Sequence, residues 1–391
     1  MKIELSDDDA AFQLELREFF TNQVPDHLRV PSATSAEVGR EAIVETQKIL
    51  NAAGLAVPTW PEKWGGRGWS TLRLHIWHQE MQRAGVVPPF AQNVSMVGPV
   101  IAQFGSPEMQ ERFLPPTANM DIYWVQGFSE PEAGSDLASL RTTAVRDGDS
   151  WVVNGQKAWT TLAHYGDWIF CLVRTDPQAA KRQQGISFLL LDLTSPGITI
   201  RPTRLIDGCH EVSEVFFDQV RVPLDQLVGE ENKGWDYAKF LLGNERIGVA
   251  PIEATKRWLA QAKELASRPV PGGTPLLDDP VLADRFVTLE NELVALELTT
   301  LRVAAGSHDG KPDPASSVLK LRGTQLQQDV TEILADLGGA GSLASGVGDD
   351  SDIDPAIRDA VPRYLNFRKA SIYGGSNEIQ RQIIASSILG L

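Results

Sequence analysis

Cysteine, net positive charge and long apolar runs are scarce or absent in this sequence of 391 residues. The two cysteines, Cys171 and Cys209, exclude a disulfide framework and a cysteine-ligated metal site, and we expect both to be buried thiols. The net charge of −15 disfavours nucleic acid and anionic membranes as partners, but it permits a local basic pocket for an anionic cofactor. No apolar run approaches the roughly 20 residues of a membrane span.

The first ten residues also lack a targeting signal. They have neither the apolar core of a secretory signal nor the arginine-rich character of a transit peptide. We therefore expect a soluble protein, cytoplasmic if it is bacterial. Apolar residues at 42% and charged residues at 22% are typical of globular chains and argue against general disorder.

No metal site is expected either. His164 and His210 are not at metal-ligand spacing with each other or with an acidic partner. The acidic loop at residues 349–354 lacks the spaced glycine and terminal glutamate of a calcium loop.

The chain is too long for one compact core, so two or three domains are expected. Residues 1–121 have helical periodicity, and residues 231–391 have it again. Between them, residues 122–230 contain short β-branched or aromatic runs separated by turn residues, which is the pattern of an antiparallel sheet or barrel. The predicted fold is α+β, with a helical domain, a β domain and a helix bundle in that order.

Individual elements follow from the same patterns. Helices are predicted over residues 7–20, 38–53, 72–84, 97–104, 234–267, 280–305, 315–335 and 376–389, with a further helix start at Ser106-Pro107. Strands are predicted over residues 150–154, 168–174, 186–191, 198–202 and 213–222. Residues 57–70, with Trp60, Trp64 and Trp69, read as an ordered loop packed by tryptophan, and residues 337–342 as a glycine-rich turn.

Three segments carry the recognisable chemistry. Residues 126–140 read Gln-Gly-Phe-Ser-Glu-Pro-Glu-Ala-Gly-Ser-Asp-Leu-Ala-Ser-Leu, and residues 153–161 read Val-Asn-Gly-Gln-Lys-Ala-Trp-Thr-Thr. Residues 373–381 read Tyr-Gly-Gly-Ser-Asn-Glu-Ile-Gln-Arg. In this order and at this spacing, the segments resemble the signatures of the acyl-CoA dehydrogenase family over essentially the whole chain. The resemblance implies FAD as cofactor, an acyl-CoA substrate and a C-terminal four-helix bundle.

The two central segments are compatible with a flavin site. A flavin ring needs an aromatic wall and hydrogen-bond donors near N5 and near N1/O2. Trp159 can supply the wall, and the Thr161 hydroxyl can donate to N5. By resemblance, Phe128 and Ser129 provide backbone and hydroxyl contacts on the pyrimidine side. For an isolated loop, ordinary turn residues between strands would be the simpler interpretation.

Further site residues follow from the resemblance. Gly134 has no Cβ, which lets its loop approach the cofactor closely. Ser135 matches the boundary between the flavin and pantetheine sites. Tyr373 is expected to contact the substrate, and Ser376 the cofactor.

The catalytic base departs from the commonest family pattern. Many members place a glutamate directly after the tyrosine of the C-terminal segment, where this chain has Gly374. Isovaleryl- and long-chain-type enzymes instead use a glutamate just before an arginine, which matches Glu245 and Arg246. Apolar neighbours predict a dry pocket that raises the pKa of Glu245. A solvated Glu-Arg pair on a helix is the alternative.

The same resemblance assigns roles to the residues around this base. Arg246 is expected to hold the pantetheine arm. Gly374 leaves room for the base and keeps a backbone N–H that polarises the thioester carbonyl. The implied reaction is concerted: Glu245 removes the α proton, and the β hydrogen leaves as hydride to flavin N5.

One half of the flavin site is missing. Homotetrameric members grip a neighbour's pyrophosphate with an arginine followed shortly by Phe-Gly, but residues 268–280 lack this element. Residues 337–342 keep their glycines without the usual aromatic. We therefore predict an α2β2 assembly with a second, diverged subunit, as in actinobacterial sterol side-chain and pimeloyl-CoA-type dehydrogenases.

The resemblance also implies an electron-transfer flavoprotein as acceptor. An acyl-CoA oxidase, or a non-catalytic partner subunit, remains the alternative. The acyl group, whether steroid, dicarboxylic or other, does not follow from the sequence.

Overall fold

The computed structural model describes residues 5–29, 35–245, 252–269, 273–306, 314–343 and 353–391. The chain divides into two compact units. The first contains residues 1–205 and 209–245, and the second contains residues 206–208 and 246–391. In the described part of the chain, no helix is both long and apolar enough to cross a membrane.

The first unit begins with helices whose starts are marked in the sequence. The helices are α1 (Asp7–Asn22), α2 (Ser35–Ala52), α3 (Thr71–Arg83), α4 (Gly98–Phe104) and α5 (Pro107–Ala118), with a π-helical segment, η3 (Gln92–Val97), before α4. The hydroxyls of Ser6, Ser70 and Ser106 accept hydrogen bonds from backbone amides in the first turns of α1, α3 and α5. The helix start at Ser106-Pro107 is therefore confirmed, and α2 is kinked at Gly39.

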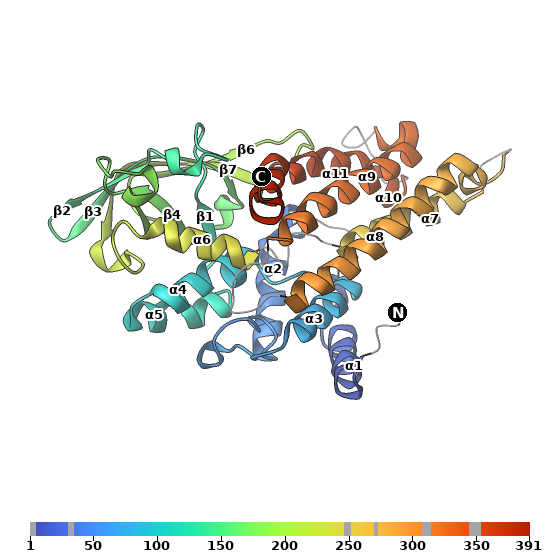
Figure 1. Cartoon of the computed structure of the whole chain (residues 1–391), viewed down its shortest axis with the longest axis horizontal. Helices are drawn as coiled ribbons and strands as arrows, with labels where there is room; N and C mark the ends of the chain where they lie inside the picture. Colours follow the sequence, from blue (N-terminus) through green and yellow to red (C-terminus); the bar gives the residue numbers. More distant parts are fainter. Residues whose placement is uncertain (1–4, 30–34, 246–251, 270–272, 307–313, 344–352) are drawn as a thin grey trace. The chain divides into compact units, whose positions relative to one another are not determined.

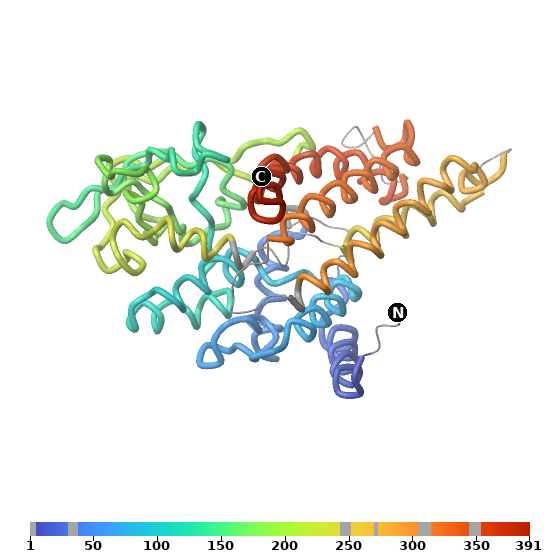
Figure 2. Tube along the Cα trace, viewed as in Figure 1, coloured from blue at the N-terminus to red at the C-terminus, as the bar shows by residue number. Residues whose placement is uncertain are grey.

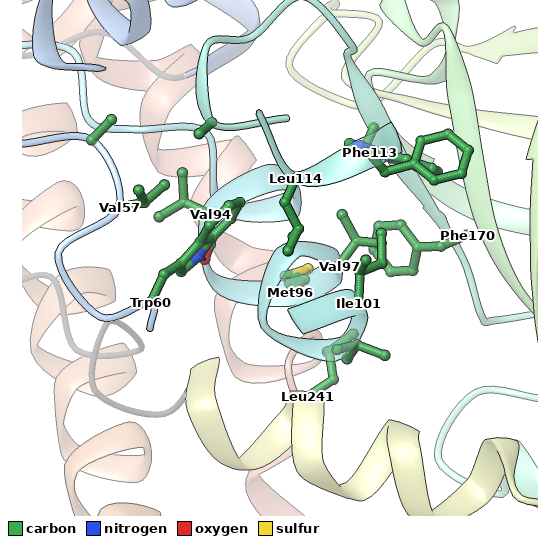
Figure 3. Close-up of a cluster of buried hydrophobic side chains, with 14 of the residues drawn as sticks. Val57, Trp60, Val94, Met96, Val97, Ile101, Phe113, Leu114, Phe170 and Leu241 are labelled. Carbon is green, nitrogen blue, oxygen red and sulfur yellow. The ribbon is translucent and has the colours of Figure 1, made fainter. Parts of the chain in front are cut away.

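The ordered loop after α2 packs through Trp60 (Figure 3). The Trp60 indole donates to the Val94 carbonyl at 2.7 Å, and its ring lies so close to Gly98 that a Cβ there would be 1.9 Å from a ring carbon. Trp64 and Trp69 lie partly buried against the same cluster. The predicted packing role of the three tryptophans is confirmed.

A seven-stranded sheet forms the rest of the first unit, together with one helix. The strands are β1 (Trp124–Gly127), β2 (Thr143–Asp147), β3 (Ser150–Thr161), β4 (Trp168–Arg174), β5 (Ile186–Asp192), β6 (Ile198–Thr203) and β7 (Val212–Pro223). Their order is β1-β4-β2-β3-β7-β6, with β5 paired to β4. Helix α6 (Gly234–Glu245) contacts β4 and β5, and Figure 1 shows it beside β4.

The sheet is not purely antiparallel, contrary to the sequence-based expectation. β1 and β4 are parallel, with Trp124 opposite Trp168. The connection between them contains the β2–β3 hairpin and is long enough for the crossover that parallel strands need. β1 and β2 were not predicted, and β3 runs to Thr161 rather than to Asn154. The segment at residues 153–161 therefore lies within a strand.

The second unit is a helix bundle. Its helices are α7 (Ile252–Ser267), α8 (Pro280–Gly306), α9 (Ser316–Ser342), α10 (Pro355–Arg358), α11 (Ala360–Phe367) and α12 (Asn377–Ile384). Figure 2 traces the chain through α7, α8 and α9 in turn. α9 contacts α7, α8, α11 and α12, and buried side chains of α7, α8, α9 and α11 form one apolar core. The predicted order of helices, sheet and helix bundle is confirmed.

Three details of the second unit differ from the prediction. α9 continues through the predicted turn to Ser342, but Gly339, with φ of 50° and ψ of −137°, interrupts its helical geometry. α10 and α11 were not predicted. The predicted helix over residues 234–267 is represented by α6 and α7, and residues 246–251 lie outside the described residues.

Candidate functional site

The segment that follows β1 is held against β3 by its backbone carbonyls. Phe128 buries its ring edge-on to Phe170 and Phe188, with ring centroids 5.8 and 6.1 Å apart. Its carbonyl accepts from the Lys157 ammonium at 3.1 Å, and the Ser129 carbonyl accepts from the Ala158 amide at 2.9 Å. The Ser129 side chain is half-buried, and its N–H has no acceptor in the described part of the chain.

A buried ion pair lies directly beneath this segment. Lys157 has no exposed side-chain surface, and its Nζ lies 2.8 Å from Oε1 of Glu130, which is 7% exposed. The Glu130 carboxylate also accepts from the amides of Arg141 and Thr142 at 2.6 and 2.9 Å. Burial opposes ionisation of Glu130, but the ammonium and the amide donors outweigh it and hold the pKa of Glu130 below its usual value.

Trp159 is presented to the outside of the sheet by a backbone irregularity. Its φ is 60°, in the left-handed region that a bulky residue rarely adopts, and the β3–β7 register shifts between Lys157 and Thr160. The side chain is 63% exposed, and no ring or cation in the described part of the chain contacts it. Strain of this kind is typical of functional positions.

The residues after Trp159 complete this edge of the sheet. Thr161 ends β3 with a half-buried side chain, and Leu162 is again left-handed with φ of 51°. His164 is exposed at the residue level. The pKa of its imidazole is nevertheless lowered, first by partial burial of the ring and second by the charge of the neighbouring His210. The two histidines thus lie near each other, which their sequence separation did not indicate.

The loop with Gly134 and Ser135 is exposed at both residues. A Cβ at Gly134 would meet nothing within 4 Å, so packing within the protein does not require glycine there. The preceding Ala133 is buried and exchanges two backbone hydrogen bonds with Glu130, at 3.0 and 3.1 Å. The buried ion pair therefore anchors the base of this loop, while its tip faces open space.

The side chains and backbone groups described above fit a flavin ring. An exposed indole, an uncommitted amide at Ser129 and the half-buried Thr161 hydroxyl are the wall and donors that a flavin ring requires. These residues belong to the first unit.

The C-terminal segment is built differently. Tyr373 is 50% exposed, and Gly374 and Gly375 both have positive φ, at 62° and 84°. The Gln380 amide donates to the Gly375 carbonyl at 3.2 Å. The Ser376 hydroxyl accepts from the Ile379 amide at 3.4 Å and caps α12, so this serine has a structural role besides any contact with a cofactor.

Gly374 has a backbone reason to be glycine. A Cβ on it would meet nothing within 4 Å, but its left-handed φ would strain any other side chain by roughly 1–2 kcal/mol. The room that we expected Gly374 to leave for Glu245 stays a prediction, because the Glu245 side chain lies outside the described residues.

Several functional assignments fall outside the described structure. Glu245 is the last residue of α6, but its side chain is outside the described residues, and so is Arg246 altogether. The predicted dry pocket around Glu245 therefore stays a prediction. In the second unit, Arg268 is engaged by Asp354 and by Glu264, the latter at 3.0 Å.

Sequence reasoning did not assign roles to two buried lysines. Lys157 lies inside the segment at residues 153–161. Its position within a run of strand residues was the feature of the sequence that could have indicated its burial. Lys320 on α9 is buried in the second unit, where its Nζ lies 3.3 Å from Oδ1 of Asn377, and burial lowers its pKa to about 8. Of the two cysteines, Cys171 is buried as expected and Cys209 is partly exposed.

Comparisons with known proteins match this architecture. Family models match in order: acyl-CoA dehydrogenase N-terminal domain over residues 6–121, middle domain over 126–220 and C-terminal domain over 232–389. Acyl-CoA dehydrogenase IpdE1 of Mycobacterium tuberculosis is 40% identical over 348 residues, which cover 88% of this chain and 86% of that protein.

Solved structures agree. The ChsE4-ChsE5 complex from M. tuberculosis matches with 32% identity and a TM-score of 0.84, covering 100% of this chain and 99% of that chain. The Tcur3481-Tcur3483 steroid ACAD matches with 29% identity and a TM-score of 0.85, at the same coverage. The resemblance inferred from the three segments is confirmed: the chain belongs to the acyl-CoA dehydrogenase family, whose members are FAD-binding oxidoreductases that act on CH–CH groups.

Proposed function

We propose that this chain is the catalytic subunit of an FAD-dependent dehydrogenase that converts an acyl-CoA to its trans-2-enoyl-CoA. The observation that carries the proposal is Trp159, held in a strained conformation with an exposed ring, directly after Ala158, whose amide binds the Ser129 carbonyl. A purely structural subunit would have no need to hold a bulky side chain in left-handed geometry at the surface. When bound, FAD supplies the acceptor for the hydride that leaves the β carbon.

The residues of the chain have separate tasks in this proposal. Glu245 removes the α proton of the thioester. The N–H of Gly374 donates to the thioester carbonyl and stabilises the developing enolate charge. Arg246, Ser135 and Tyr373 bind the pantetheine arm and the acyl group.

The cofactor is assigned to a second set of residues. Phe128, Ser129, Trp159 and Thr161 bind the flavin ring on the face of the sheet. Gly134, Ser135 and Ser376 hold the rest of FAD.

We also propose an α2β2 assembly in which a diverged second subunit completes each flavin site. One line of support is that residues 268–280 lack an arginine followed shortly by Phe-Gly. The other is that two related structures are each described by a pair of different subunits. The three-domain division at residues 1–121, 122–230 and 231–391 is part of the same proposal. A steroid-derived acyl-CoA is the proposed substrate class, because one related structure is described as a steroid ACAD.

The deciding experiment compares the chain alone with the chain co-expressed with its genomic neighbour. Flavin absorbance and mass by light scattering are recorded for both. A yellow tetramer with two flavins, formed only on co-expression, is the expected result. A yellow homotetramer with four flavins would contradict the heteromer, and absence of flavin from both preparations would contradict the dehydrogenase.

The electron acceptor is proposed to be an electron-transfer flavoprotein. Substrate reduction of the flavin is followed by mixing with either the flavoprotein or oxygen. Rapid reoxidation by oxygen with release of hydrogen peroxide would identify an acyl-CoA oxidase instead.

A further inference from the structure

The buried pair Lys157–Glu130 lies close in sequence to two proposed flavin contacts: Glu130 directly follows Ser129, and Lys157 precedes Trp159 by two residues in β3. Its ammonium reaches both the Glu130 carboxylate and the Phe128 carbonyl, at 2.8 and 3.1 Å. The carboxylate in turn accepts hydrogen bonds from the amides of Arg141 and Thr142, the two residues just before β2. The pair therefore joins three separate stretches of the first unit at one point.

The hydrogen bond from Lys157 to the Phe128 carbonyl also fixes the direction of the Ser129 N–H. The C=O and N–H of one trans peptide unit point in opposite directions. Because the Phe128 carbonyl points at the buried Lys157 ammonium, the N–H of the same peptide unit, which belongs to Ser129, must point away from it. The next peptide is fixed as well, since the Ser129 carbonyl accepts from Ala158 at 2.9 Å.

We propose that Lys157 and Glu130 are positioning residues that aim the Ser129 N–H at the pyrimidine ring of the flavin. This inference rests on the proposed function. A preorganised N–H at this ring stabilises the negative charge of reduced flavin more than it stabilises the neutral oxidised form. The ion pair thereby tunes the reduction of a cofactor that neither side chain contacts.

The test uses the wild-type assembly and three variants of it. K157M removes the ammonium but leaves a buried carboxylate, so the double variant K157M/E130Q, which leaves no buried charge, carries the test if K157M fails to fold. D147N is the matched control, because Asp147 belongs to an exposed ion pair with Arg221 in the same sheet. FAD affinity, the flavin visible spectrum and the midpoint potential are measured, together with the melting temperature of the apo-protein.

We expect the double variant to bind oxidised FAD, with a shifted visible spectrum and about a tenfold selective loss of affinity for the reduced form. That change lowers the two-electron potential by about 30 mV. D147N should match the wild type in both quantities.

Three outcomes would overturn the inference. A folded double variant with wild-type spectrum and potential would show that the pair does not direct the amide. Loss of folding in both K157M and the double variant, with D147N intact, would assign the pair a structural role alone. A wild-type assembly without flavin would overturn the proposed function and this inference with it, so the two failures are distinguishable.

Discussion

The two segments assigned to the flavin and substrate are held in opposite ways. The stretch at residues 128–130 is held by the sheet: the Phe128 and Ser129 carbonyls bond to β3, and Glu130 forms a buried ion pair with Lys157. The stretch at residues 373–376 is exposed, turns through two left-handed glycines and is tied by Gln380. The first is preorganised within the chain itself, whereas the second leaves the Tyr373 side chain 50% exposed, next to the exposed Ile372.

The largest expected effect is at Glu245, the proposed base, because the C-terminal segment has Gly374 where many family members have their catalytic glutamate. If catalysis depends on Glu245, E245Q should lower the rate of flavin reduction by acyl-CoA about 10³-fold, because the α proton loses its base. Stopped-flow bleaching of the flavin measures this rate. E231Q, in an exposed ion pair with Arg146, is the control. An E245Q protein with near-normal bleaching would move the base elsewhere.

A second prediction compares the ties that hold the two segments. K157M should lower the free energy of unfolding by about 3–5 kcal/mol, because it strands the buried Glu130 carboxylate. Q380A should lower it by only about 1 kcal/mol, since it removes one neutral side-chain donor. Denaturant unfolding of the apo-protein gives both values. Equal losses would erase the distinction between the segments.

A third prediction separates the contribution of Trp159 to FAD binding from its effect on stability. W159G should weaken FAD binding by about tenfold through loss of the aromatic wall. Its apo-protein should be as stable as the wild type or up to about 1 kcal/mol more stable, because glycine relieves the left-handed strain at some cost in entropy. Q219G, at another exposed left-handed position with φ of 51°, should leave FAD affinity unchanged. A destabilised W159G with normal FAD affinity would make the tryptophan a packing residue.

The smallest effect is expected at Gly374. G374A and G148A have matched backbones, with φ of 62° and 63°, and open space around the added methyl group. Both should lose about 1 kcal/mol of stability. A raised KM for acyl-CoA is expected in G374A alone. An equal KM in both variants would remove Gly374 from the substrate site.

Local signals predicted the helices and most strands well. Ser6, Ser70 and Ser106 act as caps where serine precedes an amphipathic run. β1 was missed because four residues are too few to show periodicity. α11 was missed because Pro362 reads as a helix breaker, although proline is tolerated in a first turn.

Residues of the candidate site could be predicted from the sequence only where the chemistry of the side chain itself suggests a role. Trp159 and Thr161 could be proposed from their chemistry, but the left-handed backbone that exposes the indole depends on the pairing of β3 with β7. Lys157 and Glu130 are 27 residues apart, and nothing local in the sequence pairs them. Their ion pair depends on the tertiary contact of β1 with β3, where the Ala158 amide donates to the Ser129 carbonyl.

The isolation of the Trp159 ring gives the protein a built-in optical reporter. Trp60, Trp124 and Trp151 are almost fully buried and should fluoresce at short wavelength, whereas the exposed Trp159 should emit at the red edge of the spectrum. A flavin against that indole would quench the red edge first. Cofactor loading could then be followed in the unlabelled protein, from the emission of the residue that makes the wall.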